Sequence, residues 1–121
     1  MGVEAHVLNA LTTYNSLTTL VSTKIYPAKV PQAVAPPAVT YRVVSGGRVN
    51  SLTGYSGLSN PQVYIDCFST SYSQVLSVST AIIEAITGST RFKAVLSDNP
   101  VDEYDDEISV HRRTLDFSIW L

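Results

Sequence analysis

The chain has 121 residues, a length typical of one domain built around a single hydrophobic core. Its formal net charge is −2 and its eight lysines and arginines are scattered, which argues against nucleic-acid binding as the main function. Only 15% of the residues are charged, against about 25% in typical proteins, so neutral polar side chains must cover much of the surface. Such a surface is easily buried against a protein partner, which favours a role in assembly. A soluble domain with a neutral surface is the alternative.

The first third of the chain predicts a helix and then an extended connector. Six apolar residues recur at spacings of three and four, as on one face of a helix over about residues 3–15: Val3, Val7, Ala10, Leu11, Tyr14 and Leu17. Threonines that follow Leu11 lower the helix propensity, so a break or a second short turn is expected before Lys24. The prolines from Pro27 to Pro37 predict an extended connector.

Two strands joined by a long hairpin loop are predicted next. Apolar and polar residues alternate over Ala38–Val44 and again over Val63–Phe68, as in strands with one buried face. Between them, Ser45–Asn60 holds four glycines among polar residues, which indicates a long, flexible, projecting hairpin loop. Loops of this length usually have a function, so contacts with other proteins are expected there.

A second helix is predicted over Tyr72–Ile86. Ser71 and Gln74 have the spacing of a capping box at its start, and Gly88 stands where a left-handed carboxyl-terminal cap belongs. Its expected buried stripe contains seven residues: Tyr72, Val75, Leu76, Ser79, Ile82, Ile83 and Ile86.

The last part of the chain predicts three strands. Phe92–Ser97 and Val101–Tyr104 are short and flank the turn Asp98-Asn99-Pro100. The closing strand, Val110–Leu121, is the clearest element, because its odd positions from Leu115 onward are large and apolar. The order of elements predicts an α+β fold, one domain over residues 1–121, with a mostly antiparallel sheet and both helices packed on one face.

The opposite face of this sheet is predicted to make contacts with partners. Two arginines are expected to pair across strands with two aspartates, namely Arg42 and Arg112 with Asp66 and Asp116. Three aromatic residues on this face predict an apolar patch: Tyr64, Phe68 and Trp120. We expect the surface of another protein to cover this patch. The alternative is that the proline-rich connector of the same chain covers it. Arg48 and Tyr55, in the predicted loop, complete the expected interface residues.

No enzyme chemistry is expected. The sequence has two histidines, His6 and His111, and neither stands in a motif typical of a catalytic base. Motifs for a nucleophile, for zinc and for phosphate binding are absent from the sequence. We therefore predict no catalytic residue, no cofactor and no metal site. The one dense charge cluster is read as a solvated hairpin, with Ca²⁺ binding as the alternative: Asp98, Asp102, Glu103, Asp105, Asp106 and Glu107.

The single cysteine and the apolar runs exclude further classes. One cysteine excludes an intrachain disulfide and fits a reducing compartment, and Cys67 stands in an alternating apolar run as a small buried side chain. The amino terminus lacks the features of a signal peptide, and no window approaches the roughly 18 apolar residues of a membrane span.

Six segments together suggest a family by their order and spacing: Leu17–Pro27, Pro37–Tyr41, the glycine-rich loop, Val63–Phe68, the helix Tyr72–Ile86 and Tyr104–Trp120. The chain resembles the tail-completion proteins (tail terminators, tail-to-head joining proteins) of long-tailed bacteriophages. The resemblance implies a structural ring subunit, commonly one of six, that caps the tail tube and meets the head connector. It carries no catalytic residues.

The same resemblance implies where the protein acts. It would be made in the cytoplasm of the host bacterium and reside in the virion at the head–tail junction, with DNA passing through the ring without specific binding; an acidic hairpin lining the channel would ease that passage. Another phage neck or minor tail subunit is the nearest alternative. A monomeric binding module and a small-molecule enzyme are more distant ones.

Overall fold

The computed structural model describes residues 3–22, 24–29, 35–51, 54–89, 92–96 and 100–120, with side chains at all of these except residues 3, 4 and 44–61. In this part of the chain the helices are α1 (Val3–Thr13), α2 (Asn15–Val21) and α3 (Tyr72–Thr87). The strands are β1 (Ile25–Pro27), β2 (Ala38–Ser51), β3 (Gly54–Ser69), β4 (Lys93–Leu96), β5 (Val101–Asp105) and β6 (Val110–Trp120). The α+β class is therefore confirmed.

The strands form one mixed sheet in the order β1-β2-β3-β6-β4, with β5 also paired to β6. Among the described strands, only β1 and β2 are parallel to each other, and the other pairs are antiparallel. The two short strands expected around a turn do not pair with each other in the described residues. Instead, β5 pairs with the first part of β6 and β4 with its last part. Asp98 and Asn99 of the expected turn lie outside the described residues.

Strand β1 was not predicted from the sequence. Its three residues are too few for an alternating pattern, and they immediately precede the connector. The main chain holds it beside β2, since Val39 N donates to the Lys24 carbonyl oxygen at 2.9 Å and Ala28 N to that of Tyr41 at 2.9 Å. Because β1 pairs with β2 and with no other described strand, it forms one edge of the sheet.

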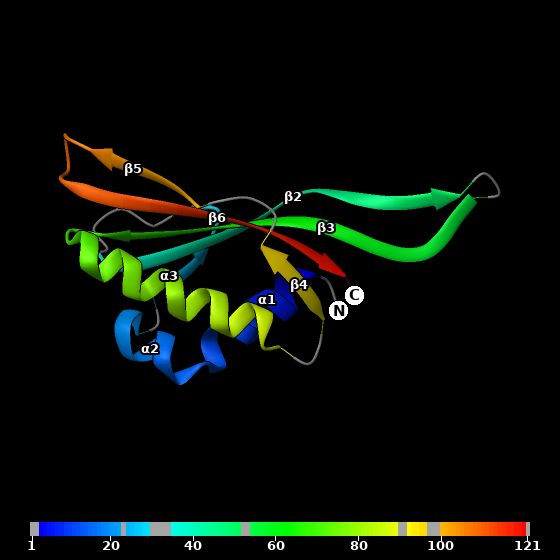
Figure 1. Cartoon of the computed structure of the whole chain (residues 1–121), viewed down its shortest axis with the longest axis horizontal. Coiled ribbons are helices and arrows are strands. Elements are labelled where there is room, and N and C mark those ends of the chain that lie inside the picture. The colour runs from blue at the N-terminus through cyan, green and yellow to red at the C-terminus, as the bar shows by residue number, and fades with distance from the viewer. Residues whose placement is uncertain are drawn as a thin grey trace.

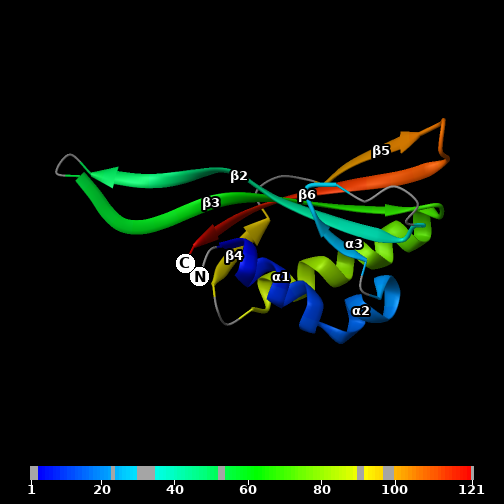
Figure 2. The same ribbon diagram turned by 180° about the vertical axis from the view of Figure 1, so that it is seen from behind.

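The predicted hairpin loop over Ser45–Asn60 is instead largely a two-stranded ribbon. Strands β2 and β3 stay paired as far as Ser51 and Gly54, with register shifts between Val43 and Gly46 and between Arg48 and Asn50. Such irregularities bend and twist a strand pair. Figures 1 and 2 show this part of β2 and β3 extending beyond the helices. The glycines of this segment suit a loop, but its backbone continues the strand pairing.

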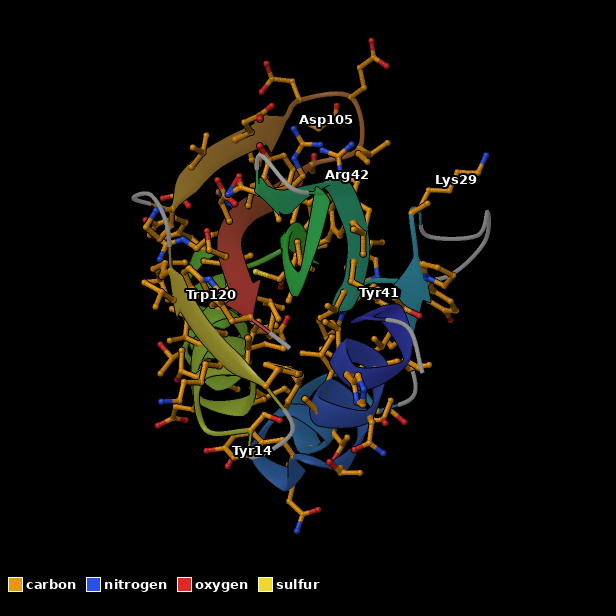
Figure 3. All side chains as sticks on the ribbon, turned by 90° about the vertical axis from the view of Figure 1, so that its right-hand side faces the viewer. Tyr14, Lys29, Tyr41, Arg42, Asp105 and Trp120 are labelled. Atoms are coloured by element: carbon orange, nitrogen blue, oxygen red, sulfur yellow. The ribbon has the colours of Figure 1, made fainter. Side chains whose placement is uncertain are left out.

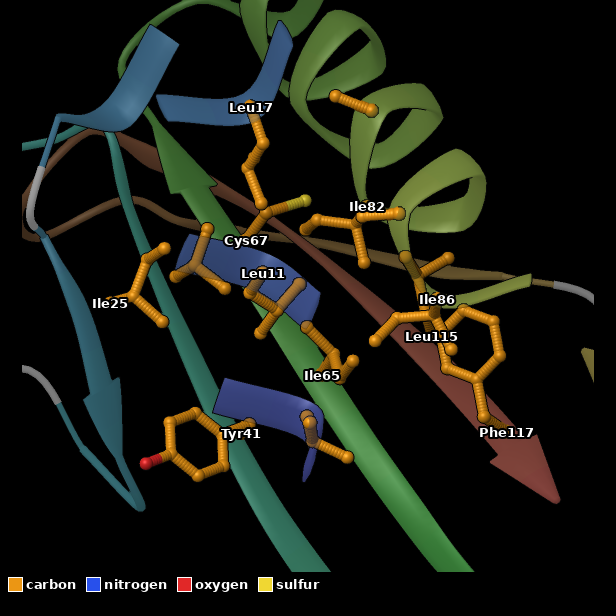
Figure 4. Close-up of a cluster of buried hydrophobic side chains, with 14 of the residues drawn as sticks. Leu11, Leu17, Ile25, Tyr41, Ile65, Cys67, Ile82, Ile86, Leu115 and Phe117 are labelled. Carbon is orange, nitrogen blue, oxygen red and sulfur yellow. The ribbon is translucent and has the colours of Figure 1, made fainter. Parts of the chain in front are cut away.

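The hydrophobic core lies between the sheet and the helices, which occupy the same side of it in Figures 1 and 2. Figure 4 shows the side chains of Leu11 and Ile82 close to those of strands β3 and β6. The alternation predicted for the closing strand is confirmed, because Leu115, Phe117 and Ile119 are fully buried while Trp120 is 41% exposed. Burial of apolar side chains at this seam is the main source of stability.

The break predicted in the amino-terminal helical region is also confirmed. Tyr14 has an extended backbone and separates α1 from α2. Val7, Leu11 and Leu17 are fully buried, as the spacing predicted. Among the described residues, the helices are too short or too polar to cross a lipid bilayer.

Helix α3 begins and ends as predicted, but by different contacts. Ser71 is the amino-terminal cap without a side-chain capping bond. The hydroxyl of Ser69 instead accepts from Ser71 N at 3.1 Å and donates to the side chain of Gln74, so the predicted capping box is wrong. The left-handed cap predicted at Gly88 is also wrong, because Gly88 has a right-handed backbone with φ of −89°. Glycine is needed there because a Cβ would stand 2.8 Å from the Glu84 carbonyl oxygen.

The buried stripe of α3 is rotated relative to the prediction. Tyr72 and Leu76 are 45% and 37% exposed, whereas Val78, Ala81 and Ala85 are buried. The small side chains of Ala81 and Ala85 allow close packing of α3 in the core. The exposed side chain of Tyr72 contacts residues of β5 and β6 instead.

Candidate interaction surface

The face of the sheet away from the helices, here called the back face, collects most of the expected contact residues. Side chains alternate between the two sides of a strand, so the neighbours of the buried Val39, Ile65 and Leu115 point away from the core. On β2, β3 and β6 the back face contains Thr40, Arg42, Tyr64, Asp66, Phe68, Val110, Arg112, Thr114 and Asp116. Six of the predicted interface residues are thereby brought together.

A groove of about 590 Å³ crosses the back face. Its floor includes Ala38, Phe68 and Val110, so it is largely apolar. Lys29, which follows β1, borders one side, and Ile108, in the turn between β5 and β6, borders the other. An open apolar groove with charged borders suits a segment of another protein better than a small reacting molecule.

The charged residues of the back face pair differently from the prediction. Arg112 forms an ion pair with Glu103 of β5, with Nη2 2.6 Å from Oε1. The guanidinium carbon of Arg42 lies 5.2 Å from the centre of the Tyr64 ring, a cation–π contact. The register explains both, because Arg42 stands opposite Tyr64, and Arg112 stands between Phe68 and Glu103.

The two aspartates accept hydrogen bonds from neutral side chains of the neighbouring strand. The hydroxyl of Thr114 donates to Asp66 Oδ1 at 2.5 Å, and the amide of Gln62 donates to Asp116 Oδ1 at 3.2 Å. These hydrogen bonds hold both carboxylates in place on the back face. The back face therefore presents a mixed array of charges beside the groove.

The three aromatic residues do not form the single patch that was predicted. Tyr64 and Phe68 lie on β3, with Phe68 opposite Arg112 of β6. Trp120 follows Arg112 by eight positions on the same strand, which separates it from Phe68 by about 26 Å. Trp120 instead stands opposite Lys93, near the 56%-exposed Val95. Arg48 and Tyr55 occupy the ribbon, and their side chains lie outside the described part of the structure.

A second cluster, on the helix side of β5, was missed by sequence reasoning. Arg113 makes two hydrogen bonds to Asp102, and the hydroxyl of Tyr72 donates to the same carboxylate at 3.1 Å. The His111 ring lies between those of Tyr72 and Tyr104, at centroid distances of 5.6 and 4.6 Å. The hydrogen bond from Arg113 lowers the pKa of Asp102, and the same bond raises the pKa of Arg113. These residues attach β5 to β6 and α3.

The chain shows no assembled reaction centre in its described residues. Cys67 is fully buried, as predicted, and burial is the main cause that raises its pKa to about 12, so the thiol is a poor nucleophile. No group of three histidine, cysteine or acidic side chains converges as a metal site in the ranges that the structure describes. All residues from Val101 to Ser109 are exposed, including the acidic ones.

Comparisons with known proteins agree with the fold. The family profile described as "Tail completion protein gp17" matches residues 5–121. A chain in the solved structure titled "Virion of native gene transfer agent (GTA) particle" superposes with a TM-score of 0.74 at 18% sequence identity, covering 98% of this chain and 92% of that one. Among curated proteins, none matches this chain. At this identity the structural likeness establishes the fold alone.

Proposed function

Because this chain belongs to the Tail completion protein gp17 family, and is thus a structural protein of the phage tail, we propose that it is a subunit of a ring that caps the tail tube and joins it to the head connector. The ring would be built from copies of this chain, commonly six. Its other partners would be the tail tube protein on one side and a head connector or neck protein on the other. The DNA would pass through the ring during delivery.

The observation that carries this proposal is the family match over nearly the whole chain. The similar chain in the gene transfer agent belongs to an assembled virion, which supports a place in the particle for this chain as well. Within the virion we place it at the head–tail junction, after synthesis in the cytoplasm of the host bacterium. The resemblance in sequence motifs leads to the same position.

The β2–β3 ribbon adds a physical argument for assembly. An isolated two-stranded hairpin is marginally stable in water, because most of its surface stays solvated. The outer ribbon extends away from the helices that cover the rest of the sheet (Figure 1). A ribbon of this kind gains stability when another protein covers it, so we propose that it contacts a neighbouring subunit or the tail tube.

Addition of the purified protein to tail tubes from particles that lack it tests the proposal. Electron microscopy of the tubes is expected to show a ring at one end, and the treated tails are expected to join filled heads. Light scattering over a range of concentrations gives the mass in solution. A monomer in solution is compatible with the proposal, because the ring can close on the tube.

Two results would contradict the ring assignment. Tubes that bear no added density, together with tails that join heads equally well without the protein, would exclude a role in completion. Density along the tube or at its distal end would favour another minor tail subunit. Binding of one copy per tail would favour a monomeric binding module, for which the back-face groove offers a site.

A further inference from the structure

Charge is unequally distributed along the sequence. Residues 5–65 contain Lys24, Lys29, Arg42 and Arg48 and no aspartate or glutamate. Residues 66–121 contain nine of the ten acidic residues and four basic ones. A chain with a formal charge of only −2 is therefore strongly polarised between its two parts.

The sheet topology places these two parts at opposite edges. Strand β1 is the last strand on one side, and β5 is paired to β6 on the other. We call Lys24 and Lys29, which flank β1, together with Arg42 of the neighbouring β2 the basic edge, and Asp105, Asp106 and Glu107 the acidic edge. In the end-on view of Figure 3, Lys29 lies at the right of the molecule and Asp105 at the top.

The acidic edge is not neutralised by the other residues that the structure describes. Asp102 and Glu103 have arginine partners on β6. In contrast, Asp105, Asp106 and Glu107 are exposed and form no ion pair with another described residue. Asp105 only accepts a hydrogen bond from Glu107 N at 3.0 Å, which shapes the turn. Three adjacent carboxylates create a local negative potential that attracts a basic surface.

Both edges also offer unpaired strand backbone, and the acidic edge has exposed apolar side chains beside it. In the described residues, β5 pairs only with β6 and β1 only with β2, so each has an open side. Open strand edges readily accept another chain. Val101 and Ile108, beside the acidic edge, are 55% and 64% exposed. Apolar side chains next to complementary charges are typical of a protein interface.

We propose that copies of this chain associate head to tail, with the acidic edge of one copy against the basic edge of the next. This inference rests on the proposed function as a ring subunit, and it names the contact that closes the ring. A contact between two different patches of the same chain generates a ring when the rotation between subunits closes. Arg42, predicted from the sequence as an interface residue, belongs to this contact.

A second copy is the partner that the charges favour. Every chain has both complementary surfaces, and their charges are equal in number, with three cations on one edge and three carboxylates on the other. An unrelated partner would need to complement only one of them. Nucleic acid is disfavoured at the acidic edge, because phosphate would be repelled there.

Charge reversal at each edge tests the contact. Lys29→Glu with Arg42→Glu reverses the basic edge, and Asp106→Lys with Glu107→Lys reverses the acidic edge. Each variant alone is expected to assemble at least about tenfold less well, since like charges would face each other at every contact. Subunits per tail end, counted by electron microscopy, and mass from light scattering give the readout.

Restoration of assembly distinguishes a contact between copies from a contact with an unrelated protein. A chain that carries all four substitutions is expected to assemble again, because both edges are reversed together. A mixture of the two single-edge variants is expected to form rings in which they alternate. Glu84→Lys, on the outside of α3, is a charge reversal of the same kind at one residue away from both edges, and this variant is expected to assemble normally. Circular dichroism checks that every variant is folded.

Three outcomes would overturn the inference. If both single-edge variants assemble like the wild type, the contact lies elsewhere although the ring assignment stands. If they fail and neither the combined chain nor the mixture restores assembly, the edges contact other proteins. If only DNA passage changes, the acidic edge lines the channel instead. Failure of the wild-type chain to assemble even on tails would instead exclude the proposed function itself.

Discussion

The guanidinium of Arg113 on β6 forms a two-point ion pair with the carboxylate of Asp102 on β5, with Nε 2.6 Å from Oδ1 and Nη2 2.9 Å from Oδ2. The two residues are register partners, and the Tyr72 hydroxyl from α3 donates to the same carboxylate. The strand β5, whose five residues are all exposed, is thus attached by side chains as well as by main-chain pairing. The pair holds the acidic edge in position.

The ion pair predicts a specific pH dependence of stability. Because the pKa of Asp102 is lowered in the folded protein, its contribution is present above the pKa of the unfolded chain and is lost as the pH falls through the folded value. The pair is partly exposed, so we expect it to contribute at most about 1 kcal/mol. Asp102→Asn should therefore be less stable than the wild type at pH 7, with the difference shrinking below about pH 4.

Urea unfolding at pH 7 and at pH 3 measures this difference. Comparison of the two proteins at each pH removes the contributions of the other carboxylates. A difference in free energy of unfolding that is the same at both pH values would show that ionisation of Asp102 does not contribute. Hydrogen exchange should show faster exchange in β5 of the variant at pH 7.

The Cys67 thiol is expected to be unreactive in the folded protein. It is fully buried and its pKa is raised to about 12, so little thiolate exists at pH 8 and reagents cannot reach it. Labelling by a maleimide or an aromatic disulfide should be at least about a hundredfold slower than in urea, where an ordinary thiol pKa near 8.5 returns. Equal rates in the two conditions would contradict this burial.

The two opposite faces of β6 should respond differently to truncation. Phe117 is fully buried, so Phe117→Ala is expected to cost about 3–5 kcal/mol of stability. Trp120 is 41% exposed, so Trp120→Ala should change stability by about 1 kcal/mol or less while weakening assembly. Thermal unfolding and ring formation on tails separate the two effects. Unchanged assembly of a folded Trp120→Ala chain would remove Trp120 from the interface.

The ribbon can be shortened while every described core residue is kept. Replacement of residues 48–59 by Asn-Gly joins Gly47 to Asn60, which are already register partners, through a two-residue turn. The domain should keep its fold, because the members of the buried cluster that the structure describes, among them Val39, Ile65 and Phe117, all remain in the shortened chain. Assembly on the tail tube should be lost. Circular dichroism and electron microscopy check the two expectations, and normal assembly of the shortened chain would exclude the ribbon as a contact.

The sequence by itself determined the elements whose signal is local. The alternation from Leu115 to Ile119 and the apolar spacing of Val7 and Leu11 correctly identified which side chains are buried. Burial of Cys67 followed from the same reasoning. These patterns are readable because strand and helix periodicity depends on neighbouring residues alone. The order of ordinary motifs was also sufficient to indicate the family, which the match over residues 5–121 shows.

Only the tertiary structure decided which strands meet and in what register. The pairing of Arg42 with Tyr64, of Arg112 with Glu103 and of Arg113 with Asp102 depends on strand alignment, which composition cannot specify. The tertiary structure also decided that β4 and β5 both pair with β6, and that β2 and β3 continue as a ribbon where a loop was predicted. A one-residue slip would turn every side chain to the other face, so the contact surfaces exist only once long-range packing has selected one register.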